Sequence, residues 1–207
     1  MLLFTVAAWR GDKNKNKSQV YRTEGLVAEA PGAGEKVVSA AKQCLNYGWA
    51  AAAETMLRAQ GVDISQTDWV VKAFGGAKCV DSGLDFAALA HALEGDYALT
   101  NGRKIRIAAE WQPGAPVNID AIIAGLVQGN VFLMGWNGRA YLLTGITYDR
   151  EINSKTGYRV YYIKEMRLVD PMAAKNSPQR QVKFVRDQND PNEISGVMTI
   201  SVSERKW

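Results

Sequence analysis

The sequence has few side chains that could hold a metal: two cysteines, Cys44 and Cys79, and one histidine, His91. A zinc site with four protein ligands needs more ligands of this kind, so we expect no metal centre. Phosphate-binding loops of the GxxxxGKS/T and GxGxxG types are also missing, which argues against a nucleotide cofactor. The sequence therefore predicts a protein that uses no cofactor.

Long apolar runs are missing as well. No stretch approaches the ~20 apolar residues that a membrane-spanning helix needs, so we expect no membrane span. Segment Met1–Ala8 resembles the end of a signal peptide, but it lacks a basic start and is short. A folded strand is expected there, with a truncated leader as the alternative.

The positive charge of the chain is not arranged as a nucleic-acid surface. The 207 residues carry a formal net charge of +4, and much of it lies in the polar segment 11–18, which contains Lys13, Lys15 and Lys17. A nucleic-acid surface needs a basic face with interleaved aromatic residues, and no such stripe is present. We expect segment 11–18 to be a solvated loop and expect no nucleic-acid partner.

The composition is that of a globular protein, with 47% hydrophobic and 22% charged residues. The length fits one domain with a sizeable core, and no linker or internal repeat divides the chain. We therefore expect a single domain over residues 1–207. Its helical half is expected at about residues 37–95 and its strand-rich half at about residues 103–204.

Helical periodicity dominates the first half. Apolar residues recur at helical spacing after Trp49, and Gly61 stands where this pattern stops. Serine and aspartate residues stand at places where they can cap further helices. The sequence predicts three helices there: Trp49–Ala59, a second one capped by Ser65 and ended by Gly75, and Leu84–Leu93, capped by Asp81 or Ser82.

Strand patterns dominate the second half, interrupted by one amphipathic helix from Asn118 to Val127. Segment Asn153–Gly157 is expected to form a hairpin loop, and the acids Asp149 and Glu151 beside it are expected to be solvated. Helices followed by a run of antiparallel strands indicate an α+β fold. The expected strands are 104–108, 131–136, 140–148, 158–169, 181–186 and 197–202.

One segment of the first half carries a family resemblance. The run Gln43-Cys44-Leu45-Asn46-Tyr47-Gly48-Trp49-Ala50-Ala51 resembles the Q-x-x-N-x-C-W-A-A run of bacterial papain-like cysteine peptidases. In that family the Gln donates to the oxyanion and the Cys is the nucleophile at the start of a long buried helix. The position that matches the nucleophile holds Gly48 in this chain.

Two segments of the second half match the same family in the same order. Segment Gly129–Gly145 resembles a run in which the catalytic His stands six residues before a Gly, and that count leads from Gly145 back to Arg139. Segment Arg167–Pro171 resembles the family's Asp-Pro ending, whose Asp orients the His, and Asp170 matches it. The resemblance spans roughly residues 37–175.

The resemblance implies a papain-like fold, in which a helical lobe packs on a twisted antiparallel sheet with a cleft between them. It also implies lost chemistry, because a thiol hydrolase needs a thiolate and a base. Gly48 has no side chain, and Arg139 stays protonated and cannot act as a general base. Arg139 is expected to pair with Asp170 instead, and Gln43 has no intermediate to stabilise.

The leading hypothesis is therefore a catalytically silent papain-like domain that binds a peptide or protein segment in the former cleft. The resemblance places Asn46, Trp49, Trp136 and Asn137 at that cleft. An extended chain could add to a strand edge there through main-chain hydrogen bonds.

Other interpretations of the same residues stay open. Gly48 could be an ordinary glycine at a helix start, since glycine is tolerated there. Cys44 or Cys79 could be a displaced nucleophile that acts with His91 in a working thiol hydrolase. The chain could also be a structural or toxin-associated module whose cleft is closed by Arg139.

The resemblance also suggests a role for the two cysteines. In papain-type enzymes a Cys a few residues before the nucleophile forms a disulfide with one some forty residues later. Cys44 and Cys79 occupy similar positions, so we expect a disulfide or a buried thiol pair between them. A disulfide favours a secreted or periplasmic protein over a cytoplasmic one.

Overall fold

The computed structural model describes residues 19–79 and 84–205. The expectations for Met1–Ala8, for the basic segment 11–18 and for caps at Asp81 or Ser82 lie outside these residues. None of the helices in the described part is long and apolar enough to cross a membrane.

The described residues form an α+β fold, which confirms the expected fold class. Eight strands make one antiparallel sheet in the order β2-β3-β8-β4-β5-β6-β7, and β1 pairs with the far half of β5. The strands are β1 Val20–Glu29, β2 Gly95–Ala98, β3 Lys104–Pro113, β4 Phe132–Trp136, β5 Arg139–Asn153, β6 Arg159–Val169, β7 Gln181–Val185 and β8 Ile194–Glu204.

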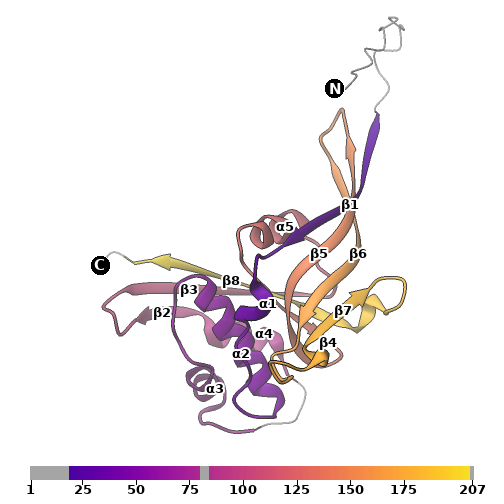
Figure 1. Cartoon of the computed structure of the whole chain (residues 1–207). Helices are drawn as coiled ribbons and strands as arrows, with labels where there is room; N and C mark the ends of the chain where they lie inside the picture. Colours follow the sequence, from indigo (N-terminus) through magenta and orange to yellow (C-terminus); the bar gives the residue numbers. More distant parts are fainter. Residues whose placement is uncertain (1–18, 80–83, 206–207) are drawn as a thin grey trace, which may run out of the picture.

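The helices gather around the middle of the sheet. Helix α2 packs on β5 and β4, α4 packs on β3, and α5 lies against β1 and β5. Figure 1 shows α2, α3 and α4 together at one end, while β1, β5 and β6 extend away from them as a long arm. The helices are α1 Ala33–Lys36, α2 Leu45–Ala59, α3 Gln66–Phe74, α4 Phe86–Leu93 and α5 Ile119–Val127, with short 3-10 helices at Pro178–Arg180 and Pro191–Glu193.

Helix α2 is the centre of the core. Its residues from Asn46 to Leu57 are all buried, and Trp49 and Leu57 expose no surface. A run of four alanines, Ala50–Ala53, keeps the helix narrow enough to lie between the sheet and α3. A helix that is buried on all sides gains its stability from packing rather than from intrinsic helix propensity.

Two helix boundaries differ from those that the sequence predicts. Helix α2 begins at Leu45, four residues before Trp49, because its first turn is buried and Gly48 therefore does not end it. Helix α4 begins at Phe86, and Asp85 caps it by accepting a hydrogen bond from the Ala88 N–H at 3.1 Å. The predicted caps of α3 at Ser65 and of α5 at Asn118 are confirmed.

The strands also differ from those that the sequence predicts. The four-residue strand β2 is not expected from the sequence, since it is short and begins at a glycine. Strand β5 runs on to Asn153, five residues beyond the expected end, because it pairs there with both β1 and β6. Strand β3 likewise ends five residues later than expected, at Pro113, and β8 begins three residues earlier, at Ile194, because the two strands pair along this length. Strands β4, β6 and β7 lie within one residue of their expected bounds.

A buried acid holds the arm together. The Asp149 side chain has no exposed surface, so the expectation that it is solvated is wrong. It accepts a hydrogen bond from the Gly25 N–H at 3.0 Å, where β1 bulges, and forms ion pairs with Arg22 and Lys164 at 3.0 Å each. The Gly25 hydrogen bond, aided by the two cations, lowers the pKa of Asp149 from 3.8 to about 2.

This pKa predicts how the stability of the protein depends on acid. The folded-state pKa of Asp149 lies below its unfolded value, so its contribution is complete above about pH 4 and is lost as the pH falls toward 2. We expect the free energy of unfolding to fall less steeply over this range in the Asp149→Asn variant than in the unmodified protein. Urea unfolding at a series of pH values measures this. Parallel curves for the two proteins would contradict it.

Candidate functional site

The segment that leads into α2 is held by buried polar groups of the core. Thr55 Oγ1 accepts a hydrogen bond from the Val38 N–H at 3.0 Å, and Gln66 Oε1 accepts one from the Ala41 N–H at 2.7 Å. The Gln66 N–H in turn donates to Glu54 Oε2 at 2.9 Å, and both side chains are buried. Hydrogen bonds to buried side chains therefore hold residues 38–41, which lie just before the first turn of α2.

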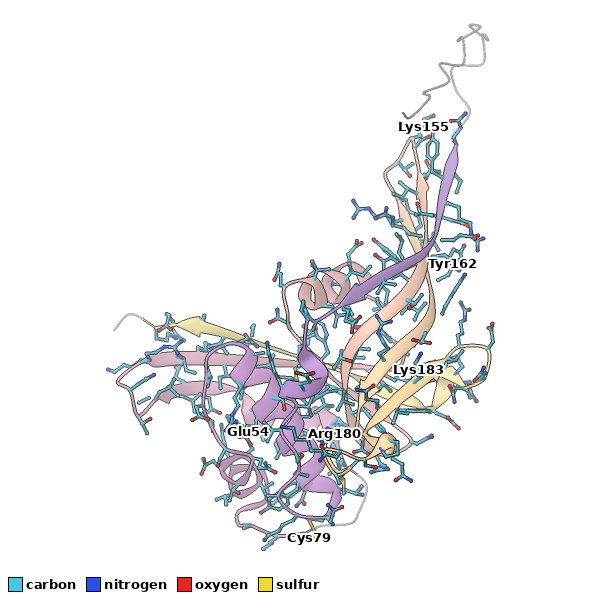
Figure 2. All side chains as sticks on the ribbon, in the orientation of Figure 1. Glu54, Cys79, Lys155, Tyr162, Arg180 and Lys183 are labelled. Atoms are coloured by element: carbon cyan, nitrogen blue, oxygen red, sulfur yellow. A yellow bond between two sulfur atoms is a disulfide. The ribbon has the colours of Figure 1, made fainter. Side chains whose placement is uncertain are left out.

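A buried arginine joins this segment to the loop that follows β6. Arg180 donates to Val37 O at 2.7 Å, to Ala173 O at 2.8 Å and to Ser39 Oγ at 3.1 Å. It is 4% exposed, and burial lowers its pKa. Figure 2 shows Arg180 beside the helical end of the molecule, near Glu54. Loop 170–180 thus lies across the start of α2.

The residue that matches the catalytic base is positioned by a tight turn. Asn137 and Gly138 have φ values of 49° and 70°, and Trp136 pairs with Arg139 across them. Asn-Gly is the preferred sequence for a two-residue hairpin turn in which both residues have positive φ. The turn brings Arg139 to the first position of β5, beside the end of β6.

Arg139 and Asp170 form an ion pair, as the sequence analysis expects. Arg139 Nη2 lies 2.8 Å from Asp170 Oδ2, and the two side chains are 41% and 7% exposed. The other carboxylate oxygen of Asp170 accepts the Met172 N–H at 2.8 Å. Arg139 is also within 5.8 Å of the Tyr141 ring centroid. Because Arg139 is half-exposed, the pair contributes little net stability, but it neutralises a nearly buried acid.

Met172 fills the space beside Gly48. A Cβ atom on Gly48 would stand 2.9 Å from Met172 Cγ and 3.0 Å from Met172 Sδ. The Gln43 side chain, from the segment before α2, reaches the loop that carries Met172, and its Nε2 donates to Met172 O at 3.4 Å. Gln43, Gly48, Arg139 and Asp170 are thus linked through one residue, Met172, whose thioether occupies the place of a side chain on Gly48.

Three of the four residues expected at a cleft are buried. Asn46 and Trp49 expose no surface, and Trp136 is 8% exposed with its Nε1–H donating to Glu193 Oε2 at 3.2 Å. Asn137 is exposed at the hairpin turn. The burial of Asn46, Trp49 and Trp136 does not support a role for these side chains in lining an open cleft.

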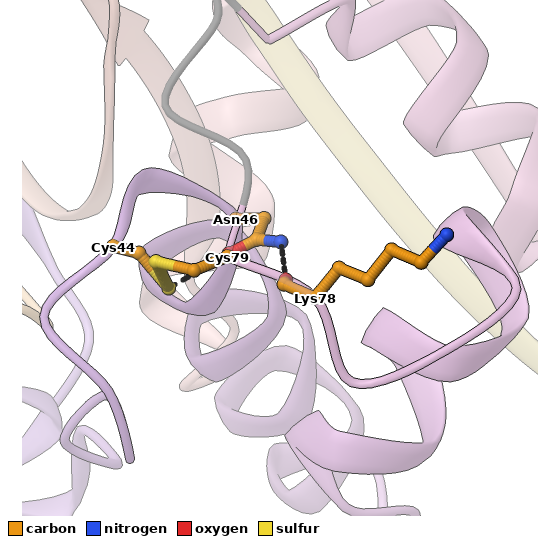
Figure 3. Close-up of a disulfide and its surroundings, with 4 residues drawn as sticks. All are labelled: Cys44, Asn46, Lys78 and Cys79. Atoms are coloured by element: carbon orange, nitrogen blue, oxygen red, sulfur yellow. Dashed lines mark hydrogen bonds between the residues drawn. A yellow bond between two sulfur atoms is a disulfide. The ribbon is translucent and has the colours of Figure 1, made fainter.

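The two cysteines form the expected disulfide. Their Cα atoms are 5.6 Å apart, and the bridge joins the residue before α2 to the chain that follows α3. Figure 3 shows Asn46 beside it, with its amide directed at Lys78 O, to which Nδ2 donates a hydrogen bond. The disulfide leaves neither sulfur as a thiol, so a hydrolase that used Cys44 or Cys79 would first need the bridge reduced.

The His91 side chain is 88% exposed near the end of α4, and its Nδ1 lies 3.2 Å from Oε2 of Glu94, the residue that follows the helix. No group of three or more His, Cys, Asp or Glu side chains that could hold a metal gathers in the described part of the chain.

No motif or spacing in the sequence points to Met172 or Arg180, and only a weak signal points to Glu54. Met172 follows Asp170-Pro171 directly, so the resemblance led to its neighbours but gave no reason to place a thioether at the site. A charged residue within a buried alanine-rich helix was the one signal that pointed to Glu54.

The comparisons with protein families and with curated proteins do not identify a family for this chain. No family model matches the chain, and no curated protein matches it.

We expect the disulfide to stabilise the fold, because it closes a loop between residues 35 positions apart. Replacing both cysteines by alanine is expected to lower the free energy of unfolding by about 3–4 kcal/mol in the chain-entropy model. Urea unfolding of the double variant measures this. Mass spectrometry after alkylation of the unreduced, denatured protein provides the check on the bond itself: two modified thiols would rule it out.

Proposed function

We propose that this chain is a catalytically silent papain-like domain that binds a peptide or protein segment at the surface around Gln43, Gly48 and Arg139. The observation that carries this proposal is the Arg139–Asp170 ion pair beside the start of the buried helix α2. It stands at the strand ends where the resemblance expects a His–Asp pair. Retention of this arrangement without a nucleophile or a base favours binding over catalysis.

The chemistry of the site supports the proposal that the domain has no catalytic activity. Gly48 offers no nucleophile, and a guanidinium holds its proton at any working pH, so Arg139 takes no proton from a substrate. Gln43 remains exposed and able to donate a hydrogen bond, which suits a carbonyl oxygen of a bound chain as well as it suits an oxyanion. The disulfide is compatible with a secreted or periplasmic protein.

A second candidate function is a structural or toxin-associated module with a closed site, and the position of Met172 favours it. Its thioether lies against Gly48, and its main-chain oxygen accepts from Gln43. Where Met172 stays in place, a bound segment reaches only the exposed rim. The two candidates therefore differ in whether Met172 limits binding.

Selection of peptides from a phage-displayed random library tests the binding function. Peptides enriched on the unmodified protein are expected to bind about tenfold more weakly to a Gln43→Trp variant, because the indole covers the exposed rim of the site. The matched control is Lys155→Trp at the tip of the β5–β6 hairpin (Figure 2), which should leave binding unchanged. Binding that is gained only on Met172→Ala would favour the closed module. Enriched peptides that bind the Gln43→Trp variant as tightly as the unmodified protein would contradict the proposed binding surface.

Introducing a thiol at position 48 and an imidazole at position 139 tests whether the domain is catalytically silent. We expect no hydrolysis of fluorogenic peptides by the unmodified protein, and none after Gly48→Cys or Arg139→His alone, because the two groups act as a unit. The two changes together are expected to give weak turnover that rises when Met172→Ala frees space for the thiol. Gly48→Ser with Arg139→His is the matched control. Cleavage by the unmodified protein that disappears on Cys44→Ala would instead support the displaced-nucleophile hypothesis.

A further inference from the structure

A hollow that is separate from the site around Gly48 lies between the start of α5, strands β6 and β7 and the start of β8. Its volume is about 220 Å³, below the ~300–1,000 Å³ of most ligand pockets, so it suits one branched or aromatic group rather than a large cofactor. Most of the surface of its walls is apolar. They include Pro116, Ile119, Ile163, Met166, Phe184 and Ile194.

One cation stands at this hollow. Arg186 is the one charged residue among the described residues that line it, and its side chain is exposed. Its main-chain N–H donates to Lys164 O, but its guanidinium forms no ion pair or hydrogen bond with any residue of the described ranges. An arginine fork with no partner in the described part of the chain, next to an apolar hollow, complements a carboxylate attached to an apolar group.

The acidic side chains near the hollow do not pair with the Arg186 guanidinium. Asp120 is occupied by the Tyr161 hydroxyl, which donates to it, and by Arg159 at 3.0 Å. Asp190 accepts from the Asn192 N–H at 2.9 Å, and Glu193 accepts from the indole of Trp136. Asp187 follows Arg186 in the chain and forms no ion pair with it. The guanidinium therefore stays available to a ligand.

The strand beside the hollow does not offer an edge for a peptide. At the end of β7, the Val185 N–H donates to Asn189 Oδ1 at 2.8 Å, and Val185 O accepts from the Gln188 and Asn189 N–H groups at 2.9 Å each. These main-chain groups are already paired, so an extended chain cannot add to β7 at this point. A small molecule fits the hollow better than a peptide does.

We propose that this hollow is a binding site for a small carboxylic acid with a branched or aromatic tail. The tail lies among Ile119, Ile163, Met166 and Phe184, and the carboxylate pairs with Arg186. The proposal does not depend on the function of the site around Gly48, because it shares no residue with that site.

Titration with isocaproate, followed by methyl NMR of the intact chain, tests this site. Saturable shifts are expected at the methyl groups of Ile119, Ile163, Met166 and Ile194. Isocaproamide, which has the same tail without the charge, should bind about tenfold more weakly, the size of one lost charge-assisted hydrogen bond. Arg186→Gln should weaken isocaproate binding by the same factor, and the matched control Lys155→Gln should leave it unchanged.

A third variant tests the hollow itself. Ala115 is exposed at the rim, in the loop before α5, so Ala115→Phe should fill the space without disturbing the core, and binding should disappear. The proposal is overturned if the four methyl groups show no saturable shift, if acid and amide bind equally, or if Arg186→Gln binds as well as the unmodified chain. Shifts caused by a peptide such as acetyl-Gly-Gly-Leu, but not by isocaproate, would reject the small-molecule assignment.

Discussion

The burial of α2 is the constraint on which the rest of the structure depends. A helix that is covered on all sides must also bury its polar side chains, and each of those needs a hydrogen-bond partner because water cannot reach it. Glu54 and Thr55 find their partners in the segment before the helix and in the start of α3. Burial of one helix thus determines the path of the chain that leads into it.

The site around Gly48 is a consequence of that path. Residues 37–41 are held by the core, and the loop after β6 is joined to them by Arg180 and by the hydrogen bond from the Ala40 N–H to Pro171 O at 2.8 Å. This loop carries Asp170 and Met172 to the start of α2. These contacts hold the Asp170 carboxylate beside Arg139, with which it forms an ion pair.

The arm of β1, β5 and β6 is stabilised by different interactions. It is far from the centre of the core, and it is held by charged side chains around Asp149 rather than by apolar packing alone. Among the strands that the structure describes, β1 pairs with β5 alone, and its bulge at Gly25 breaks the regular edge that it presents. A bulge and charged residues are common devices that discourage the pairing of a free edge with another chain.

Much of the fold could be predicted from the sequence, since helical spacing from Trp49 onward, the caps at Ser65 and Asn118 and the alternation in the second half are local signals. The Asn137-Gly138 turn is local too, and it sets the register that places Arg139. The order of the resembling segments led to the pair of Arg139 with Asp170 and to the disulfide between Cys44 and Cys79.

Local patterns could not show which side chains meet across the chain. The short strand β2 forms only because β3 is there to pair with it, and Asp149 is buried only because Arg22, Gly25 and Lys164 surround it. Met172 occupies the space beside Gly48 through the packing of a loop that is distant in sequence. Arg186, which has no ion-pair partner among the described residues, stands at a hollow made by four separate segments. By itself, therefore, the sequence determined the periodicities, the caps and turns, and the presence of Gly48 and Arg139 at the positions compared with the family. The tertiary structure decided which side chains are buried and which of them pair with one another, because both depend on residues far apart in the chain.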